Sequence, residues 1–567
     1  MKFCKLLLSF IFVGSLITAI SACVSSPSET DVRILVNQVG YYENSKKTAI
    51  VTNTDRDEIS IKSMETDVIV YTASLTPPVF WDAAHENLRI ADFSDFKIPG
   101  KYILVLAGNI ESDPIEIRST INRKPAELLL KSYYYQRAGL DILPIYGGKW
   151  NWKAGHLQDA ECQFHPSTGK TGTWESPGGW YDAGDYGKYI VNGGITVGTI
   201  LGFYELYPAL IGDNLVIPES GNGISDLLDE VRYELEWMRT MQDMDGGVFF
   251  KLSGLKWPGM DVLPAADTQK RYIIGKSTTS TLNFCAVMAM AGRIYAESDA
   301  SFSTACLTSA EKAWQWAVDN PNSAPPDTGI PGSGPYDDAN FEDEFLWASA
   351  ELYKSTGINA YAEWIRHHPS QFKVTSRSWW QNVRNLGVFS LVSSDISFDT
   401  DLIVKAKKSI LDTANKYLEE IRKSPAQVPM DVASFTWGSH GNIGNKGIIL
   451  AYAHYLTGDR TYLEGLLEIA DYLSGRNATG YSSATGLGSN PPIFPHHRPS
   501  VADGIKEPVP GLVVGGPNPY KQDGLSYPNS APARCYLDVT QSYSSNEPAI
   551  NQNAAVFFVF AYMAAQE

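Results

Sequence analysis

The chain has 567 residues, 44% of them hydrophobic and 19% charged, which suits two folded domains with a large core and excludes global disorder. With 63 Asp and Glu against 46 Lys and Arg, the net charge is −17, and such a surface repels nucleic acids and anionic membranes. We therefore expect no nucleic-acid partner and favour a neutral ligand.

The first 22 residues are predicted to be a signal peptide. Lys2 and Lys5 give the segment a positively charged start. The apolar run that follows, 6–20, is too short to span a membrane. The run ends in Ile-Ser-Ala-Cys, which resembles the lipobox of bacterial lipoproteins, so Cys23 would be lipidated. The alternative is ordinary secretory cleavage near Ala22. Both predict export. With the lipid, acyl chains alone hold the protein at the cell envelope, on the outer membrane surface or its periplasmic face.

Residues 23–31 are predicted to be a polar tether, and residues 32–118 a small all-β sandwich. Short β-rich runs recur there, among them 49–51, 68–71 and 102–105, with Gly and Pro between them. The sequence of this region clusters no titratable groups around a pocket. We therefore predict that it stabilises or positions the domain that follows.

From residue 119 to the end, the hydrophobic period becomes helical, as in Leu227, Leu228, Val231 and Leu235. We predict helices over 125–138, 188–207, 224–242, 278–295, 308–318, 342–353, 402–421, 447–456 and 549–564. Long Gly- and Pro-rich loops separate several of them, and loops of that length are usually functional. The pattern predicts a mainly α protein in which one large helical toroid follows the sandwich.

Four cysteines lie beyond the predicted lipidation site: Cys162, Cys285, Cys306 and Cys535. Their wide spacing contains no CxxC and no recognisable zinc pattern. In an exported protein they could form disulfides or remain buried free thiols, and the sequence does not pair them.

The first cluster that carries chemistry is residues 178–189, Gly-Gly-Trp-Tyr-Asp-Ala-Gly-Asp-Tyr-Gly-Lys-Tyr. Gly184 permits a tight turn that could aim Asp182 and Asp185 into one cavity. Neighbouring carboxylates repel, which raises the pKa of one and suits a proton acceptor. The alternative is that these aspartates simply cap the following helix.

The second cluster, residues 488–498, contains three prolines that stiffen a loop ending in His496, His497 and Arg498. These side chains suit a polyhydroxylated ligand or a carboxylate that must be oriented. A solvated basic patch is the alternative.

The third cluster is residues 536–554, which include Asp538, Tyr543 and Glu547. Glu547 stands at the start of a predicted helix and is followed by Pro548, so helix capping is again the alternative. The sequence alone does not show that Glu547 lies near the aspartates more than 350 residues earlier.

Together the three clusters resemble glycoside hydrolase family 9, the inverting cellulases. The third cluster fits the family pattern at its fixed positions, and the Asp-Ala-Gly-Asp-Tyr-Gly-Lys-Tyr run is a close match. The histidine loop fits in its second half, with Ala484 where a larger apolar residue is usual. The front domain, with Asn-Gln-Val-Gly-Tyr at 37–41, resembles the immunoglobulin-like module that precedes many such catalytic domains. The resemblance covers nearly all of the mature chain.

The resemblance implies an (α/α)6 barrel with an open cleft and the hydrolysis of β-1,4-glucosidic bonds in cellulose-like glucan, mixed-linkage glucan or xyloglucan. Asp185 would be the general base, Asp182 would share the nucleophilic water, and Glu547 would be the general acid. Inversion implies that acid and base stand about 6.5–9.5 Å apart. Residues that would orient neighbours or bind sugar hydroxyls are His496, Asp538 and Arg498.

A β-glucan also suits the aromatic content, because sugar faces stack on Trp and Tyr. We predict substrate contacts for Trp437, Tyr181 and Tyr543, with Trp437 favoured. Other aromatic residues in predicted loops could stack on sugars or simply pack in the core; they are Trp150, Trp152, Trp174, Trp180 and Trp257.

No cofactor is required by this chemistry, although the resemblance raises two metals. Asp343 and Glu344 match an Asp-Glu helix start that ligates calcium in some relatives, and carboxylate oxygens suit Ca²⁺. They equally suit the helix macrodipole. Some relatives hold zinc through cysteines and a histidine before the paired aspartates. This chain has Tyr181 at the histidine position and only Cys162 upstream, so we do not expect zinc.

The main prediction is therefore a monomeric endo-β-1,4-glucanase. One alternative is an exo-acting cellodextrinase or β-glucosaminidase, which would differ in loops that block one end of the cleft. Another is a catalytically silent glycan-binding lipoprotein, against which the retained carboxylates argue.

Overall fold

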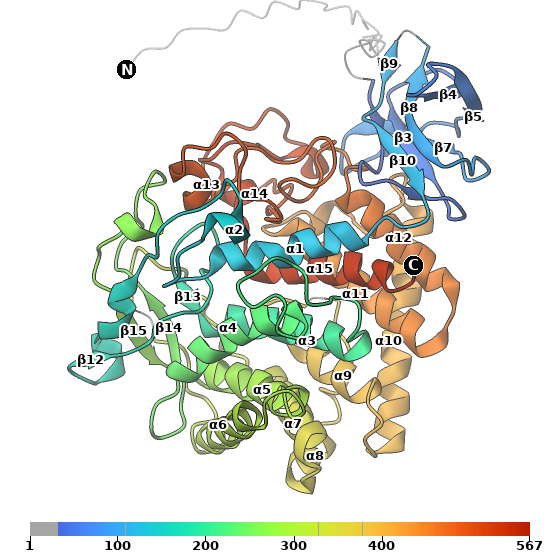
Figure 1. Ribbon diagram of the computed structural model, residues 1–567. Coiled ribbons are helices and arrows are strands. Elements are labelled where there is room, and N and C mark those ends of the chain that lie inside the picture. Colours follow the sequence, from blue (N-terminus) through green and yellow to red (C-terminus); the bar gives the residue numbers. More distant parts are fainter. Residues whose placement is uncertain (1–31, 108, 327, 377) are drawn as a thin grey trace, which may run out of the picture.

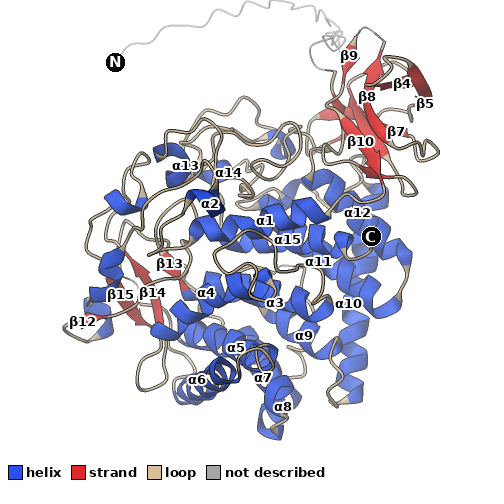
Figure 2. Ribbon diagram, viewed as in Figure 1, coloured by secondary structure: helices blue, strands red, loops and turns tan. Residues whose placement is uncertain are grey.

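A computed structural model describes residues 32–567 apart from 108, 327 and 377. The predicted signal peptide, Cys23 and the tether lie outside the described residues. Figure 1 shows a small sandwich of strands beside a much larger helical body, and Figure 2 shows that most strands belong to the sandwich. Within the described residues, no helix is both long and apolar enough to cross a membrane.

The N-terminal domain is a β-sandwich, as predicted. One sheet has the order β1-β3-β7-β6 and the other β2-β10-β8-β4-β5, with β9 paired to β8. Side chains alternate between the core and solvent along β8, where Tyr102, Leu104 and Leu106 point inward. The strands are β1 Ile34–Leu35, β2 Tyr41–Tyr42, β3 Thr48–Thr52, β4 Glu58–Ser63, β5 Ile69–Ser74, β6 Val79–Trp81, β7 Glu86–Asp92, β8 Gly100–Leu106, β9 Ile110–Glu111 and β10 Ile115–Arg118.

The remainder of the chain forms the (α/α)6 barrel. Its helices are α1 Arg123–Gln136, α2 Pro144–Gly147, α3 Ile190–Leu206, α4 Asp226–Thr240, α5 Thr278–Ile294, α6 Ala300–Asp319, α7 Glu342–Thr356, α8 Asn359–His367, α9 Arg384–Val392, α10 Thr400–Lys423, α11 Ser439–Thr457, α12 Arg460–Leu473, α13 Arg498–Ala502, α14 Tyr543–Asn546 and α15 Ile550–Ala564.

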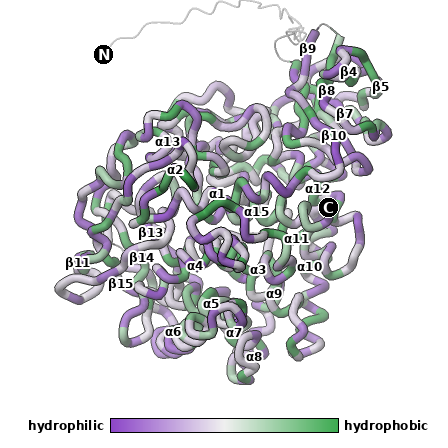
Figure 3. Tube along the Cα trace, in the orientation of Figure 1, coloured by the Kyte–Doolittle hydropathy of each residue, from purple (hydrophilic) through white to green (hydrophobic). Residues whose placement is uncertain are grey.

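Burial separates inner from outer helices. Helices α5 and α15 are buried along nearly their whole length, whereas α6 and α10 bury a single stripe with a helical period. On α10 that stripe includes Leu402, Ala406 and Ile410, and Figure 3 shows hydrophobic and hydrophilic residues alternating along this helix. Helix α15, near the C-terminus, packs beside α1 at the start of the barrel (Figure 1). The barrel is thereby closed by the two ends of its own sequence.

A five-stranded sheet within the barrel domain was not predicted. Its order is β12-β11-β15-β14-β13, and its strands are β11 Cys162–Phe164, β12 Thr173–Trp174, β13 Lys188–Tyr189, β14 Phe249–Ser253 and β15 Tyr272–Lys276. These strands have two to five residues, too few for a period of two to stand out in sequence. Strand β13 links the 178–187 loop to helix α3, so the sheet holds the loop that carries Asp182 and Asp185.

Other differences from the prediction are local. Six helices of the described chain were missed: α2, α8, α9, α12, α13 and α14. Helix α6 begins at Ala300 rather than at 308, and α11 begins at Ser439 rather than at 447. Helices α8 and α9 have only nine residues each, about two and a half turns, which gives a weak periodic signal. The four cysteines of the described chain are buried free thiols.

Polar contacts join the sandwich to the barrel. Asn37 donates a hydrogen bond to Asp471 at 2.7 Å. The side chain of Gln38 donates to the Gly480 carbonyl at 2.7 Å and accepts from the Asn490 backbone at 2.9 Å. Asn490 lies in the second sequence cluster, so the sandwich contacts the loop that leads to His496.

Candidate active site

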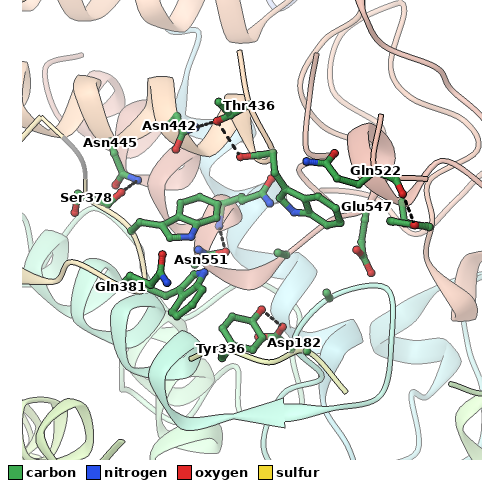
Figure 4. Close-up of a pocket in the computed structure, with 18 of the residues that line it drawn as sticks. Asp182, Tyr336, Ser378, Gln381, Thr436, Asn442, Asn445, Gln522, Glu547 and Asn551 are labelled. Atoms are coloured by element: carbon green, nitrogen blue, oxygen red, sulfur yellow. Dashed lines mark hydrogen bonds between the residues drawn. The ribbon is translucent and has the colours of Figure 1, made fainter. Parts of the chain in front are cut away.

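A cavity of about 1590 Å³ brings residues of all three sequence clusters together. They come from segments more than 300 residues apart, and Figure 4 shows Glu547 and the hydrogen-bonded Asp182–Tyr336 pair around this cavity. The predicted site residues that line it are Asp182, Asp185, His496, Arg498, Trp437, Tyr543 and Glu547.

The turn that carries the two aspartates is shaped by Gly184 and Gly187. The Asp182 backbone N–H donates to the Gly187 carbonyl, which closes the turn. A Cβ atom at Gly184 would lie 1.8 Å from the His496 carbonyl oxygen, so only glycine fits where the two loops meet. Helix α3 begins after Tyr189 and has no side-chain cap. The aspartates therefore do not cap it.

Both aspartates are buried, with exposed fractions of 2% and 6%. Asn192 donates to Oδ1 of Asp182 at 2.6 Å, and the Tyr336 hydroxyl donates to Oδ2. Burial and the charge of Asp185 raise the pKa of Asp182 to about 7. Burial also raises the pKa of Asp185, while the Arg498 guanidinium opposes that shift.

Glu547 approaches the same turn from the C-terminal part of the chain. A Cβ atom at Gly184 would lie 3.3 Å from Glu547 Oε1. Burial, followed by the charge of Asp185, raises the pKa of Glu547 well above its ordinary value. Helix α15 starts three residues later and has no side-chain cap, so Glu547 does not cap it. A carboxyl group that keeps its proton above the pH at which a glutamate ordinarily ionises can donate that proton into the cavity.

His496 and Arg498 line the same cavity as these carboxyl groups. His496 Nδ1 lies 2.6 Å from the Thr540 carbonyl oxygen, and burial lowers the pKa of His496 to about 4. The ring is therefore neutral, with Nδ1–H donating to the carbonyl and Nε2 left as an acceptor. Arg498 donates from Nη1 to the Gly184 carbonyl at 2.7 Å and from Nε to the Pro258 carbonyl at 3.1 Å.

Asp538 does not line the cavity but fixes the loop that does. It accepts hydrogen bonds from the backbone of Ile493 at 2.8 Å and of Phe494 at 2.9 Å. Asn546, next to Glu547, donates to it from its side chain at 3.0 Å. Asp538 thus ties the His496 loop to the segment that carries Glu547.

Trp437 and Tyr543 lie on the cavity with ring centroids 5.9 Å apart. Trp257 also lines it, and its ring lies under the Arg498 guanidinium. Tyr181, in contrast, was predicted to contact substrate but packs behind the loop, where it is 1% exposed and its hydroxyl lies 2.6 Å from His156 Nδ1. Burial among Ala138 and Tyr186 explains this difference.

Five aromatic residues on the cavity were not singled out from the sequence: Tyr336, Trp379, Trp380, Tyr417 and Tyr520. Trp379 and Trp380 are an adjacent pair between predicted helices, a signal that could have been noticed. Tyr336 lies in a Gly- and Pro-rich stretch, and nothing in its sequence neighbourhood points to Asp182. Trp150, Trp152, Trp174 and Trp180 do not line the cavity.

Asp343 and Glu344 lie in the first turn of α7, away from the cavity. Asp343 accepts from the Val383 backbone at 2.8 Å. Both carboxylate oxygens of Glu344, and Oδ2 of Asp338, are buried without a hydrogen-bond donor. Burial, then the charges of Asp343 and Asp338, raises the pKa of Glu344 well above its ordinary value.

These orphaned oxygens fit a hard cation such as Ca²⁺. Among the described residues, no three acidic, His or Cys side chains converge well enough to hold a metal by themselves. Calcium at Asp343 and Glu344 would therefore also need carbonyl oxygens or water.

Comparison with known families assigns both domains. The family model described as "Glycosyl hydrolase family 9" matches residues 124–560, and "Cellulase N-terminal ig-like domain" matches residues 29–110. The chain is 38% identical to a xyloglucan-specific endo-β-1,4-glucanase of Bacteroides ovatus, over 94% of each chain. It is 32% identical to endoglucanase D of Acetivibrio thermocellus, over 98% of this chain and 87% of that one.

Solved structures agree. The crystal structure of a metagenome-derived family 9 endoglucanase matches with a TM-score of 0.87 and 36% identity, over 94% of this chain and 99% of that one. A Bacteroides ovatus family 9 structure matches with a TM-score of 0.86 and 36% identity, over the same shares of the two chains.

Proposed function

Because the chain belongs to glycosyl hydrolase family 9 and is therefore a glycoside hydrolase, we propose that it cleaves internal β-1,4 bonds of a β-glucan with inversion. The observation that carries the proposal is the meeting of Asp182, Asp185 and Glu547 at one large cavity. The charge of Asp185 adds to the rise in the pKa of Glu547, whereas Arg498 opposes the rise in the pKa of Asp185, as acid and base roles require.

Glu547 is the proposed general acid. Its raised pKa keeps the proton in place until the glycosidic oxygen departs, and that oxygen then takes the proton. The charge of Asp185 contributes to this raised pKa, because two neighbouring negative charges repel and the protonated form of Glu547 avoids that repulsion.

Asp185 is the proposed general base, and Asp182 holds the attacking water with it. The water oxygen forms the new bond to the anomeric carbon while Asp185 takes its proton. Arg498 keeps Asp185 easier to ionise than burial alone would allow. Asp182 has both oxygens occupied by Asn192 and Tyr336, which suits an orienting role.

Binding of the glucan is assigned to the polar and aromatic wall. His496 Nε2 is an acceptor for a sugar hydroxyl, and Arg498 is a donor. Trp437, Tyr543 and Trp257 offer ring faces to pyranose rings. Asp538 acts on the substrate only through the loops that it joins.

Xyloglucan is the substrate we favour, because the chain is 38% identical, over 94% of its length, to an enzyme named for that specificity. The cavity volume of about 1590 Å³ is compatible with a substrate that carries side branches. We further propose export, with lipidation of Cys23 as the anchor.

Product analysis tests the function. Residues 24–567 are incubated separately with xyloglucan, mixed-linkage glucan and cellohexaose, and the products are followed from the first minutes. We expect oligosaccharides of several intermediate lengths, and NMR spectra in which the α-anomer of the new reducing end appears first. Early release of only glucose or cellobiose would reject internal cleavage, and first appearance of the β-anomer would reject inversion.

A further inference from the structure

The segment 333–336 forms part of the cavity wall, and one of its residues, Gly334, is held through both its backbone N–H and its carbonyl. The Gly334 backbone N–H donates to the Tyr189 hydroxyl at 2.9 Å. The Gly334 carbonyl accepts from Lys251 Nζ at 2.6 Å. Ser333 Oγ lies 3.3 Å from the same Tyr189 hydroxyl.

The two residues that hold Gly334 are cross-strand neighbours. Tyr189 on β13 is directly paired with Lys251 on β14. Both are buried, with exposed fractions of 2% and 3%, and Lys251 does not line the cavity. A buried ammonium group needs hydrogen-bond acceptors, and the Gly334 carbonyl is one for Lys251.

Holding Gly334 determines where Tyr336 lies. Tyr336 has a φ of +46°, a conformation that a bulky residue adopts only when its surroundings impose it. Its ring packs between Tyr189, at a centroid distance of 4.5 Å, and Trp380, at 5.0 Å. Its hydroxyl donates to Asp182, as Figure 4 shows. Gly334 also leaves room for this ring, because a Cβ atom there would lie 2.9 Å from Tyr336 Cε2.

We propose that Lys251 and Tyr189 form a clamp on the Gly334 backbone, and that this clamp presents the Tyr336 hydroxyl to Asp182. Lys251 is then a positioning residue of the hydrolytic site, acting through Tyr336 without touching substrate. The proposal rests on the role proposed above for Asp182.

A purely electrostatic role for Lys251 makes a different prediction. Its charge also acts on Asp185 and Asp337, which lie near enough to influence its own ionisation. Through that route the loss of Lys251 would affect Asp185 independently of Tyr336. The two routes are therefore separable by a double-mutant cycle.

The experiment compares Lys251→Met, Tyr336→Phe and the double variant with the full mature protein at pH 6, on xyloglucan and on cellohexaose. Each single substitution should lower kcat/KM about ten-fold, the effect of losing one hydrogen bond to a charged group. The double variant should lose about ten-fold as well, because the clamp and Tyr336 act in series. A loss of about one hundred-fold would mean independent effects and would overturn the proposal.

The pH profile gives a second readout. The Tyr336 hydrogen bond lowers the pKa of Asp182, so its loss should move the acidic limb of kcat/KM to higher pH in Tyr336→Phe. Lys251→Met should produce the same displacement, with no further displacement in the double variant. A merely structural defect would lower the rates without moving this limb.

Controls separate the clamp from folding and from the proposed function. Lys276→Met removes a lysine from the adjacent strand β15, where it pairs with Asp243 and Asp245, and should retain wild-type rates. If Lys251→Met does not fold, Tyr189→Phe, which removes the hydroxyl that accepts from the Gly334 N–H, replaces it in the cycle. Asp182→Asn is measured first: full activity there rejects the proposed role of Asp182, whereas an inactive Asp182→Asn with an additive cycle rejects only the clamp.

Discussion

Gly184 lies against Glu547: a Cβ atom at Gly184 would sit 3.3 Å from Glu547 Oε1, and the nearby Gly184 backbone opposes part of the rise in the pKa of the glutamate. The turn between the two aspartates thus meets the proposed acid directly. This contact joins segments that are 363 residues apart in the sequence.

Gly184→Ala should lower kcat/KM by at least about 100-fold. Its Cβ atom would lie 1.8 Å from the His496 carbonyl oxygen, so one of the two loops must move, and displacements near 1 Å carry costs of this size. Steady-state kinetics checks the prediction, with Gly202→Ala in helix α3 as a control at a glycine where a Cβ would make only an ordinary contact, 3.7 Å from the Tyr452 hydroxyl. Unchanged kinetics in Gly184→Ala would contradict the close fit.

Glu547→Gln should lower the rate on xyloglucan or cellohexaose by about 100- to 10,000-fold, the usual contribution of general acid catalysis. Substrates whose leaving group needs no proton, such as a dinitrophenyl cellobioside, should lose far less. Oligosaccharide binding, measured by calorimetry, should persist. Equal losses on both substrate types would remove Glu547 from the acid role.

Glu234→Gln should flatten the decline of stability above pH 5. Glu234 is buried, accepts from the Trp180 backbone at 2.6 Å, and has its pKa raised by burial to about 8. Between about 4.5 and 8 the unfolded state releases this proton while the folded state keeps it, so the free energy of unfolding falls as pH rises, by at most about 1.4 kcal/mol per pH unit.

Thermal unfolding between pH 5 and pH 9 measures that slope. Glu236→Gln, on the same helix but with its side chain 54% exposed and paired with Arg232, is the matched control and should keep the wild-type slope. A Glu234→Gln protein with an unchanged slope would show that this carboxyl does not carry the proton.

Calcium should raise the unfolding temperature of the wild type, and EGTA should reverse the effect. Glu344→Gln should abolish this response, because both of its orphaned oxygens are proposed ligands. Glu342→Gln, an exposed acid in the same first turn, should retain it. Equal responses in the two variants would favour the helix macrodipole over a metal site.

The sequence determined more of the site than of the secondary structure around it. Asp182, Asp185 and Glu547 were found because their spacing and neighbours form compact local patterns, such as the glycines at 184 and 187. Helix α10 was found because its hydrophobic residues recur with a helical period, whereas α3 and α5 were found because their mostly apolar runs of 17 residues are too long for a strand. Short elements such as α8, α9 and strands β11–β15 were missed, because two to nine residues give too weak a period.

The tertiary structure decided which side chains reach the cavity. Tyr181 stands beside Asp182 in sequence yet turns into the core, whereas Tyr336, about 150 residues further on, reaches Asp182 through a loop held by Lys251. The sequence by itself determined the chemical groups available and the approximate turns that carry them. Their meeting depends on long-range packing of the barrel, because contacts between distant segments leave no fixed spacing along the chain.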